Sequence, residues 1–596
     1  MLLGISESIS KRKKESALIM RKQTKLVAVL STAALLALGA SMSSFAATGW
    51  QEENGTWVYY DKSGDKETEK WEKSGDNWFY LNEDGEMATD LIVEYNDNYY
   101  YVDDNGSMVT NKWVSVENSE FDGDDENEPA NHWYYFGANG KAYKSSSSSS
   151  TASFKTINGK KYIFDDEGKM LYGWINESGQ KETGDDAWRG DGTTGGLYYC
   201  GDENDGAQTI GWVNLHITDN QWDSAASLGS SSKDAFDDEE QDRWFYFKGN
   251  GKKMVNKKGE TINGKKYSFD LEGRMNADWV NWDTTPTASS AIQKASPSYI
   301  SGFRYYGSPE DGARITKGWF QVVPGSYVNE GDYNDDSENW YYADKDGKLI
   351  AGEMKTINGK KYAFGFDGAM LDSYRFIKLA SDNKTIVKIQ NKDTGNVPNA
   401  NAIVGTHTDS NYKFDTVDGF KKNASSWEKD GYRLYYFGSG DDGSMKTNKQ
   451  TISIDGENTT FLLNKSGSFK GAGKTGLDSK KYYQSGMLMA ADKDDKYAVV
   501  KVTKSGADIS YMELLTTDEF LAEMEDLGVH SVVTDATKYS EEFNVETAAS
   551  SVANTEYRLV NTSGSVQKSK TKAKDGNDRC YDVASNGDIK RVYVED

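Results

Sequence analysis

The stretch WVYYDKSG at residues 57–64 recurs with variation as WFYLNEDG at residues 78–85 and as YYYVDDNG at residues 99–106. The three copies align without gaps and start 21 residues apart. Each has four mostly aromatic residues, then polar residues, then a glycine. This order predicts a β-strand, a tight turn in which glycine takes a positive φ, and a returning strand. A fixed spacing of similar segments indicates a repeat architecture.

Further copies of this hairpin follow, separated by insertions. They run from Trp133 to Gly140, Tyr162 to Gly168, Leu197 to Gly206, Trp244 to Gly251, Tyr267 to Gly273, Phe303 to Gly312, Trp340 to Gly347, Tyr362 to Gly368, Leu434 to Gly443 and Lys481 to Gly486. The words TINGKKY recur at residues 156–162, 261–267 and 356–362, so a longer module has also been duplicated. A single hairpin is only marginally stable in water, and stacking several hairpins side by side buries the apolar surface that stabilises them. We therefore expect an all-β chain, an elongated β-solenoid of stacked hairpin repeats with short irregular or α-containing insertions.

The spacing of the glycines divides the chain into regions with and without regular hairpins. We expect a signal peptide at 1–46, β-hairpin repeats at 47–373, an irregular insertion at 374–426, further repeats at 427–490, and a C-terminal region with a short helix and degenerate repeats at 491–596. The helix is predicted by a capping box from Thr516 to Glu519, apolar residues from Phe520 onward, and Gly528 as the stop.

The first residues have the pattern of an export signal. Basic Arg21, Lys22 and Lys25 precede the apolar stretch 26–40, which is short for a membrane span, and a small-x-small cleavage motif stands at 44–46. Translation could begin at Met1 or at Met20. The pattern predicts a secreted protein with no membrane segment once the signal is removed.

Composition excludes several classes of protein. A formal net charge of −25 argues against nucleic acid as a partner, because phosphates would be repelled. Two cysteines are too few for a disulfide framework in a secreted chain of this length. Hydrophobic residues make up 36% and aromatic residues 13%, so tyrosine, tryptophan and phenylalanine supply much of the apolar surface.

Alternate residues of a strand share a face, so Trp57 and Tyr59 point one way and Val58 the other. Both faces could serve packing alone. Alternatively, the Trp-x-Tyr pairs and the tryptophans before them could form shallow aromatic cages that hold a quaternary ammonium group or stack on sugar rings. The candidate ligand-binding residues are Trp50, Trp57, Tyr59, Trp71, Trp78, Tyr80, Tyr101, Trp113, Trp133, Tyr135, Trp174, Trp212, Trp244, Tyr246, Trp279, Trp319, Trp340 and Tyr342. Many weak sites on one chain would give firm attachment through avidity.

The pairs Gly173-Trp174, Gly211-Trp212 and Gly318-Trp319, together with the Trp-Tyr-Tyr strands, resemble the choline-binding and glucan-binding cell-wall repeats of Gram-positive surface proteins. The resemblance implies a β-solenoid, export to the cell surface or cell wall, and non-covalent, non-catalytic attachment to choline-bearing teichoic acid or polysaccharide. The chain departs from the pattern where Lys70, Lys112 or Asp278 replaces the glycine and where residues 91–92 replace Gly-Trp.

Catalytic and cofactor motifs are weak in this sequence. Residues 468–475 nearly spell a phosphate-binding loop, but Ser468 stands where glycine is required. The four histidines are well separated and form no zinc-binding pair, so we expect no cofactor and no metal. Two alternatives remain: a secreted cell-wall hydrolase of the amidase or glycosidase type with its catalytic part in a non-repeat stretch, and an adhesin or scaffold that binds a protein partner. The sequence leaves the oligomeric state open.

Overall fold

The computed structural model describes residues 48–121, 128–146, 150–190, 196–223, 227–231, 233–236, 238–283, 296–390, 413–529, 533–546 and 552–595. The predicted signal peptide and part of the predicted insertion at 374–426 lie outside these ranges. Chain contacts divide the molecule into unit 1, residues 1–218 with 245–254, and unit 2, residues 219–244 with 255–596. No helix in the described ranges is long and apolar enough to cross a membrane.

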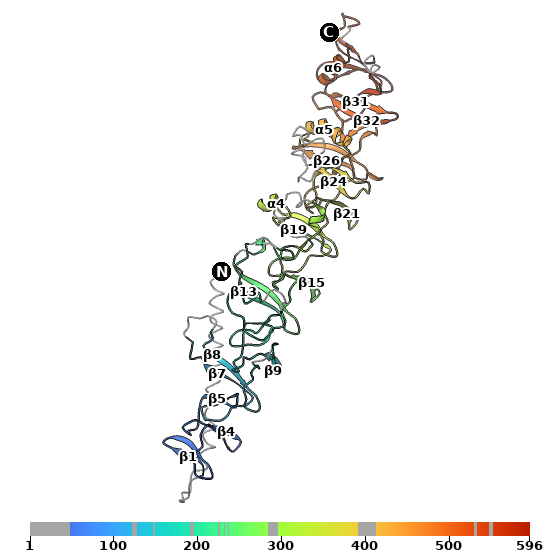
Figure 1. Cartoon of the computed structure of the whole chain (residues 1–596). Helices are drawn as coiled ribbons and strands as arrows, with labels where there is room; N and C mark the ends of the chain where they lie inside the picture. The colour runs from blue at the N-terminus through green and yellow to red at the C-terminus, as the bar shows by residue number, and fades with distance from the viewer. Residues whose placement is uncertain are drawn as a thin grey trace. The chain divides into compact units, whose positions relative to one another are not determined.

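Unit 1 is a succession of antiparallel two-stranded hairpins (Figure 1). Its paired strands are β1 (Gly49–Glu53) with β2 (Thr56–Tyr60), β3 (Lys70–Ser74) with β4 (Asn77–Leu81), β5 (Leu91–Tyr95) with β6 (Asn98–Val102), β7 (Lys112–Glu117) with β8 (Asn131–Phe136), β9 (Lys155–Ile157) with β10 (Lys160–Tyr162), and β11 (Trp174–Ile175) with β12 (Tyr198–Tyr199). Strand β13 (Gly211–Thr218) follows, and β14 (Glu240–Phe247) contributes residues to both units. The prediction of an all-β hairpin repeat is confirmed.

Unit 2 begins with the same hairpins and continues into larger sheets. Its hairpins are β15 (Lys257–Ile262) with β16 (Lys265–Phe269), β17 (Trp279–Asn281) with β18 (Phe303–Tyr305), β19 (Gly318–Val322) with β20 (Asn339–Ala343), and β21 (Glu353–Ile357) with β22 (Lys360–Phe364). The larger sheets follow, with the strands of each given in spatial order. The first has β24 (Ile386–Gln390), β23 (Tyr374–Leu379) and β25 (Arg433–Tyr436), and the second has β26 (Asn448–Ile454), β27 (Glu457–Leu463), β30 (Met487–Leu488), β29 (Lys481–Gln484) and β28 (Gly476–Asp478). The third has β32 (Asp508–Leu515), β31 (Tyr497–Ser505) and β34 (Thr555–Asn561), and the fourth has β33 (Tyr539–Asn544), β37 (Ile589–Glu595), β36 (Arg579–Val583) and β35 (Lys570–Lys574).

The turn after each second strand explains the sequence motif. The Asp61 carboxylate accepts hydrogen bonds from the backbone N–H groups of Ser63 and Asp65, at 2.8 and 2.9 Å. Gly64 closes this turn at a φ of 86°, a region that side chains disfavour. The acidic or amide residue and the glycine are therefore both required by the turn.

A hydrogen-bond ladder joins each hairpin to the one before it. The N–H of Met87 donates to the carbonyl of Trp57 at 2.7 Å, and the N–H of Met108 donates to the carbonyl of Trp78 at 2.8 Å. In unit 2 the N–H of Met370 donates likewise to Trp340, at 2.8 Å. These bonds tie consecutive repeats within each unit.

The methionines of the ladder also explain why the turn residue is glycine. A Cβ placed on Gly106 would lie 2.8 Å from the Met87 side chain, and one on Gly140 would lie 2.5 Å from Met108. Both distances are shorter than van der Waals contact. Each turn glycine is thus packed against the side chain of the preceding repeat, which fixes how closely the repeats stack.

The insertions that carry helices lie between the first and second strands of a hairpin. The short helices α3 (Pro297–Ile300) and α4 (Glu330–Asn334) interrupt β17–β18 and β19–β20 in this way. Helix α5 (Val417–Lys429) and β24 stand between β23 and β25, which still pair directly. The segment carrying α6 (Thr517–Asp526) stands between β31 and β34. A 3-10 turn, η1 (Lys233–Ala235), is also present.

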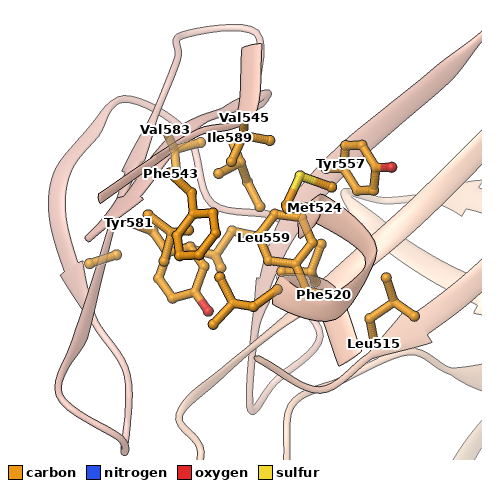
Figure 2. Packing of buried hydrophobic residues seen from close by; sticks show 14 residues of the cluster. Leu515, Phe520, Met524, Phe543, Val545, Tyr557, Leu559, Tyr581, Val583 and Ile589 are labelled. Atoms are coloured by element: carbon orange, nitrogen blue, oxygen red, sulfur yellow. The ribbon is translucent and has the colours of Figure 1, made fainter. Parts of the chain in front are cut away.

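The C-terminal core surrounds α6 (Figure 2). The predicted capping box is confirmed, because the Thr516 side chain accepts from the Glu519 N–H and the Glu519 carboxylate accepts from the Thr516 N–H. Phe520 and Met524 point into the cluster beside Phe543 and Leu559. Local packing accounts for this helix, as its apolar residues predict.

Candidate functional site

Where a first strand carries a tryptophan, that residue lies opposite a tyrosine of the second strand. Trp50 is the register partner of Tyr59, and their ring centroids are 5.4 Å apart with an edge-on geometry. Equivalent pairs are Trp71 with Tyr80 at 5.2 Å, Trp113 with Tyr135 at 5.2 Å, Trp212 with Tyr246 at 5.1 Å, and Trp319 with Tyr342 at 5.1 Å. Such edge-on pairs are a favourable arrangement of aromatic rings.

The same tryptophans also contact the following hairpin. The ring of Trp50 lies 5.4 Å from Phe79, and that of Trp71 lies 5.2 Å from Tyr100. Trp113 and Trp319 repeat this contact with Tyr162 and Tyr362, at 4.9 and 4.8 Å. Each of these tryptophans is therefore shared between two consecutive repeats, and part of its surface serves packing.

All but one of the predicted ligand-binding residues retain exposed surface, and the exception is Trp279, which is buried. Trp78 is 40% exposed and Trp279 is 2% exposed, and the other sixteen of the eighteen are half-buried. Half-buried rings can pack on one side and receive a ligand on the other.

Not every predicted residue joins a ring pair. Several of the tryptophans are the first residue of the aromatic run in the second strand. Of these, Trp57 lies opposite Glu52, Trp78 opposite Lys73, and Trp133 opposite Ser115, so each of the three faces a polar residue across its hairpin. Trp340 differs, since its ring lies 6.4 Å from Trp319. Trp244, at the same strand position, is half-buried.

Tyr101 lies opposite Ile92 rather than a tryptophan, and its hydroxyl donates to Asp90. Here the replacement of Gly-Trp that the sequence shows removes one ring from the pair.

Two tyrosines were missed by the sequence reasoning. Trp174 pairs with Tyr199 at 5.0 Å, and Trp279 pairs with Tyr305 at 5.2 Å. Both tyrosines occupy the third position of the repeated motif, counted from Leu197 and Phe303 as Tyr59 is counted from Trp57. Selecting the residue at that position in every hairpin would have identified both tyrosines.

The hydroxyls of Tyr80 and Tyr101 stay protonated at neutral pH. Burial raises the pKa of Tyr80, and the nearby Glu69 raises it further. Burial also raises the pKa of Tyr101, and its hydrogen bond to Asp90 raises that pKa further. Neutral rings keep the electron-rich faces that attract cations.

Asp278 gives one hairpin a pH-dependent stability. It replaces the glycine before Trp279 and has a φ of 55°. Burial, together with the nearby Asp234, raises its pKa to about 7. Because the folded-state pKa is the higher one, the stability associated with protonated Asp278 is fully present below about pH 4 and is lost as the pH rises through 7. We expect Asp278→Asn to melt at a higher temperature than the parent, by a margin that grows from pH 4 to pH 7.

A neighbouring residue provides a control of opposite sign. The ion pair with Lys258 lowers the pKa of Asp283 against the effect of burial. Asp283→Asn should therefore lose stability, most at neutral pH. Melting curves of both variants from pH 4 to pH 8 test this pair, and a pH-independent margin for Asp278→Asn would contradict the expectation.

The described residues offer little for metal or nucleotide chemistry. Within the described ranges, no group of three or more His, Cys, Asp or Glu side chains is placed to hold a metal ion. His407 and His530 lie outside those ranges. In the segment that resembles a phosphate-binding loop, Gly471 has a φ of 86° and packs against Met445. The glycines there are explained by the hairpin stack.

Comparison with known families identifies the repeats. Residues 68–113 match the family "Choline-binding repeat", and residues 130–142 and 333–349 match the family "Putative cell wall binding repeat". The matched segments include β3 to β6, β8 and β20. These segments of the chain therefore carry repeats of the choline-binding and cell-wall-binding type.

Similar proteins come from streptococci. The chain is 25% identical over 296 residues to Glucosyltransferase-S of Streptococcus mutans, a match that covers 44% of this chain and 17% of that enzyme. Choline binding protein F of Streptococcus pneumoniae is 16% identical with a TM-score of 0.29, covering 73% of this chain and 100% of that one. The modular autolysin LytC of the same organism is 16% identical with a TM-score of 0.27, covering 56% of each chain.

Proposed function

We propose that this cell-wall-binding repeat protein attaches non-catalytically to a wall polymer through shallow aromatic sites between stacked hairpins. The observation that carries the proposal is the set of half-buried tryptophans Trp50, Trp71, Trp113, Trp174 and Trp319, each of which pairs with a tyrosine of its own hairpin and contacts an aromatic ring of the next. The ligand class is choline-substituted teichoic acid, with glucan as the second candidate. The stacked hairpins form a β-solenoid, and the protein acts outside the cell, at its surface.

The charge of the chain suits the cationic group of choline. A net charge of −25 attracts quaternary ammonium groups and repels free phosphate. The glucan alternative is favoured by the match to a glucosyltransferase, which spans a small part of that enzyme. Sugar rings would stack on the same tryptophan faces.

The hydrolase and adhesin alternatives depend on the insertions. The described part of the insertion between β23 and β25 consists of one strand and one helix, whose apolar residues pack into the neighbouring core. A catalytic site would need polar groups converging on a cleft. Binding through the repeats is the simpler account of the chain.

The first experiment is adsorption of the secreted protein to purified choline-containing cell walls, with choline as competitor. Release by choline supports quaternary-ammonium sites. Retention that choline does not affect but soluble glucan reverses supports the second candidate. Lack of adsorption contradicts wall attachment, and release of soluble wall fragments over time would contradict the non-catalytic role.

Substitution of Trp71 tests the site itself. We expect Trp71→Ala to weaken choline binding at that site by about 2- to 30-fold, since one cation–π contact contributes about 0.5 to 2 kcal/mol. Equilibrium dialysis with labelled choline measures this change. The matched control is Ile92→Ala at the equivalent position of the next hairpin, where no tryptophan is present. Equal effects of the two substitutions would indicate that packing, rather than the ring, is what was lost.

A further inference from the structure

Lys253 occupies a ladder position that carries methionine in several sister repeats. It stands two residues after the turn glycine Gly251, as Met87 follows Gly85 and Met108 follows Gly106. Its backbone N–H donates to the carbonyl of Leu197 at 2.7 Å, which is the bond that Met87 makes to Trp57. The backbone is thus unchanged, and the substitution affects only the side chain.

The lysine side chain is fully enclosed. Lys253 has 0% exposed surface, and its ammonium donates hydrogen bonds to the carbonyls of Trp188 and Arg189. The Nζ atom lies 5.3 Å from the centroid of Trp174 and 5.7 Å from that of Phe245. Both distances are within the range of a cation–π interaction.

These rings correspond to the proposed ligand sites. Trp174 is a first-strand tryptophan, and Phe245, 5.3 Å from it, is the aromatic residue of the next hairpin. They match Trp71 and Tyr100 in the site described above. Two carbonyls and two ring faces compensate the cost of removing the ammonium from water, which would otherwise be large.

We propose that Lys253 is an internal ligand of the Trp174 site. Its ammonium takes the place of an external quaternary ammonium group, so this site is closed to choline while sites with methionine at the ladder position are open. The residue two positions after the turn glycine therefore determines which repeats bind. This inference rests on the proposed function for its ligand class and on the Lys253 geometry for its location.

The test replaces Lys253 by the sister residue. We expect the secreted chain carrying Lys253→Met to bind one more choline per chain than the parent in equilibrium dialysis. Lys252→Met is the matched control, because Lys252 is the adjacent residue and its ammonium pairs with Glu177 at 2.7 Å, outside the aromatic site. Unchanged stoichiometry in a Lys253→Met chain that melts like the parent would overturn the inference.

A second measurement does not depend on choline. Reductive methylation of the native chain with formaldehyde and a borohydride, followed by peptide mass spectrometry, reports which amines are accessible. We expect Lys253 to remain unmodified under conditions that dimethylate Lys252, and to react once the chain is unfolded in denaturant. If Lys253 and Lys252 react equally in the folded chain, the Lys253 ammonium is not enclosed and the inference is wrong. If the parent binds no choline but Lys253 is protected from methylation, choline is not the ligand, whereas the enclosure of the Lys253 ammonium in the aromatic site is confirmed.

Discussion

Replacing Phe520 by alanine is expected to reduce the free energy of unfolding of the C-terminal sheets by about 3 to 5 kcal/mol. Phe520 is fully buried in the cluster around α6, and its ring lies 5.4 Å from Tyr557 of β34. Its removal leaves a cavity where α6 meets the strands (Figure 2). Hydrogen exchange followed by mass spectrometry measures the loss, as faster exchange across β31 and β34.

The control for this substitution is Phe469→Ala. Phe469 is 51% exposed and contacts the Arg433 guanidinium at 5.4 Å. A single exposed cation–π contact contributes about 0.5 to 1 kcal/mol, so the control should lose at most that amount. Similar losses at both positions would show that α6 is not anchored by its apolar face.

Replacing Gly473 by alanine is expected to destabilise the sheet that contains β27 by about 1 to 3 kcal/mol. A Cβ at Gly473 would lie 2.2 Å from the carbonyl oxygen of Ser485, and backbone atoms cannot move aside as a flexible side chain can. The N–H of Gly473 also donates to Leu434 at 2.8 Å, so the segment cannot shift without losing a rung of the ladder. Urea denaturation followed by tryptophan fluorescence measures the loss.

Gly331→Ala serves as its control. Gly331 lies in α4, and a Cβ there meets nothing closer than 3.6 Å. Alanine favours helix over glycine, so this variant should be unchanged or more stable by up to about 1 kcal/mol. If Gly473→Ala behaves in the same way, the glycine is not required for close approach.

The hairpin pattern could be read from the sequence because the turn chemistry is local. The Asp61 to Gly64 turn and the alternation of Trp57, Val58 and Tyr59 depend on neighbouring residues alone, and the structure confirms both. The capping box at Thr516 is local in the same sense. The division into five regions stays a prediction, as does the assignment of the eighteen residues to a ligand.

Long-range pairing could not be predicted. Tyr374 begins a strand whose partner, β25, lies beyond an insertion that includes α5, so the stretch reads as irregular although it holds one half of a hairpin. β31 is separated from β34 in the same way. The enclosure of Lys253 also depends on residues 188 and 189, which are far from it in sequence. Periodicity carries no information about such partners.

Placing the insertions between paired strands has a consequence for how such a protein can diversify. The ends of each insertion are already held together by the flanking strands, and the entropy of closing a longer loop grows only slowly with its length. A loop of another sequence could be exchanged at the β19–β20 or β31–β34 junction while the strand register on either side is kept. The hairpins then serve as a constant frame into which new recognition segments can be grafted one at a time.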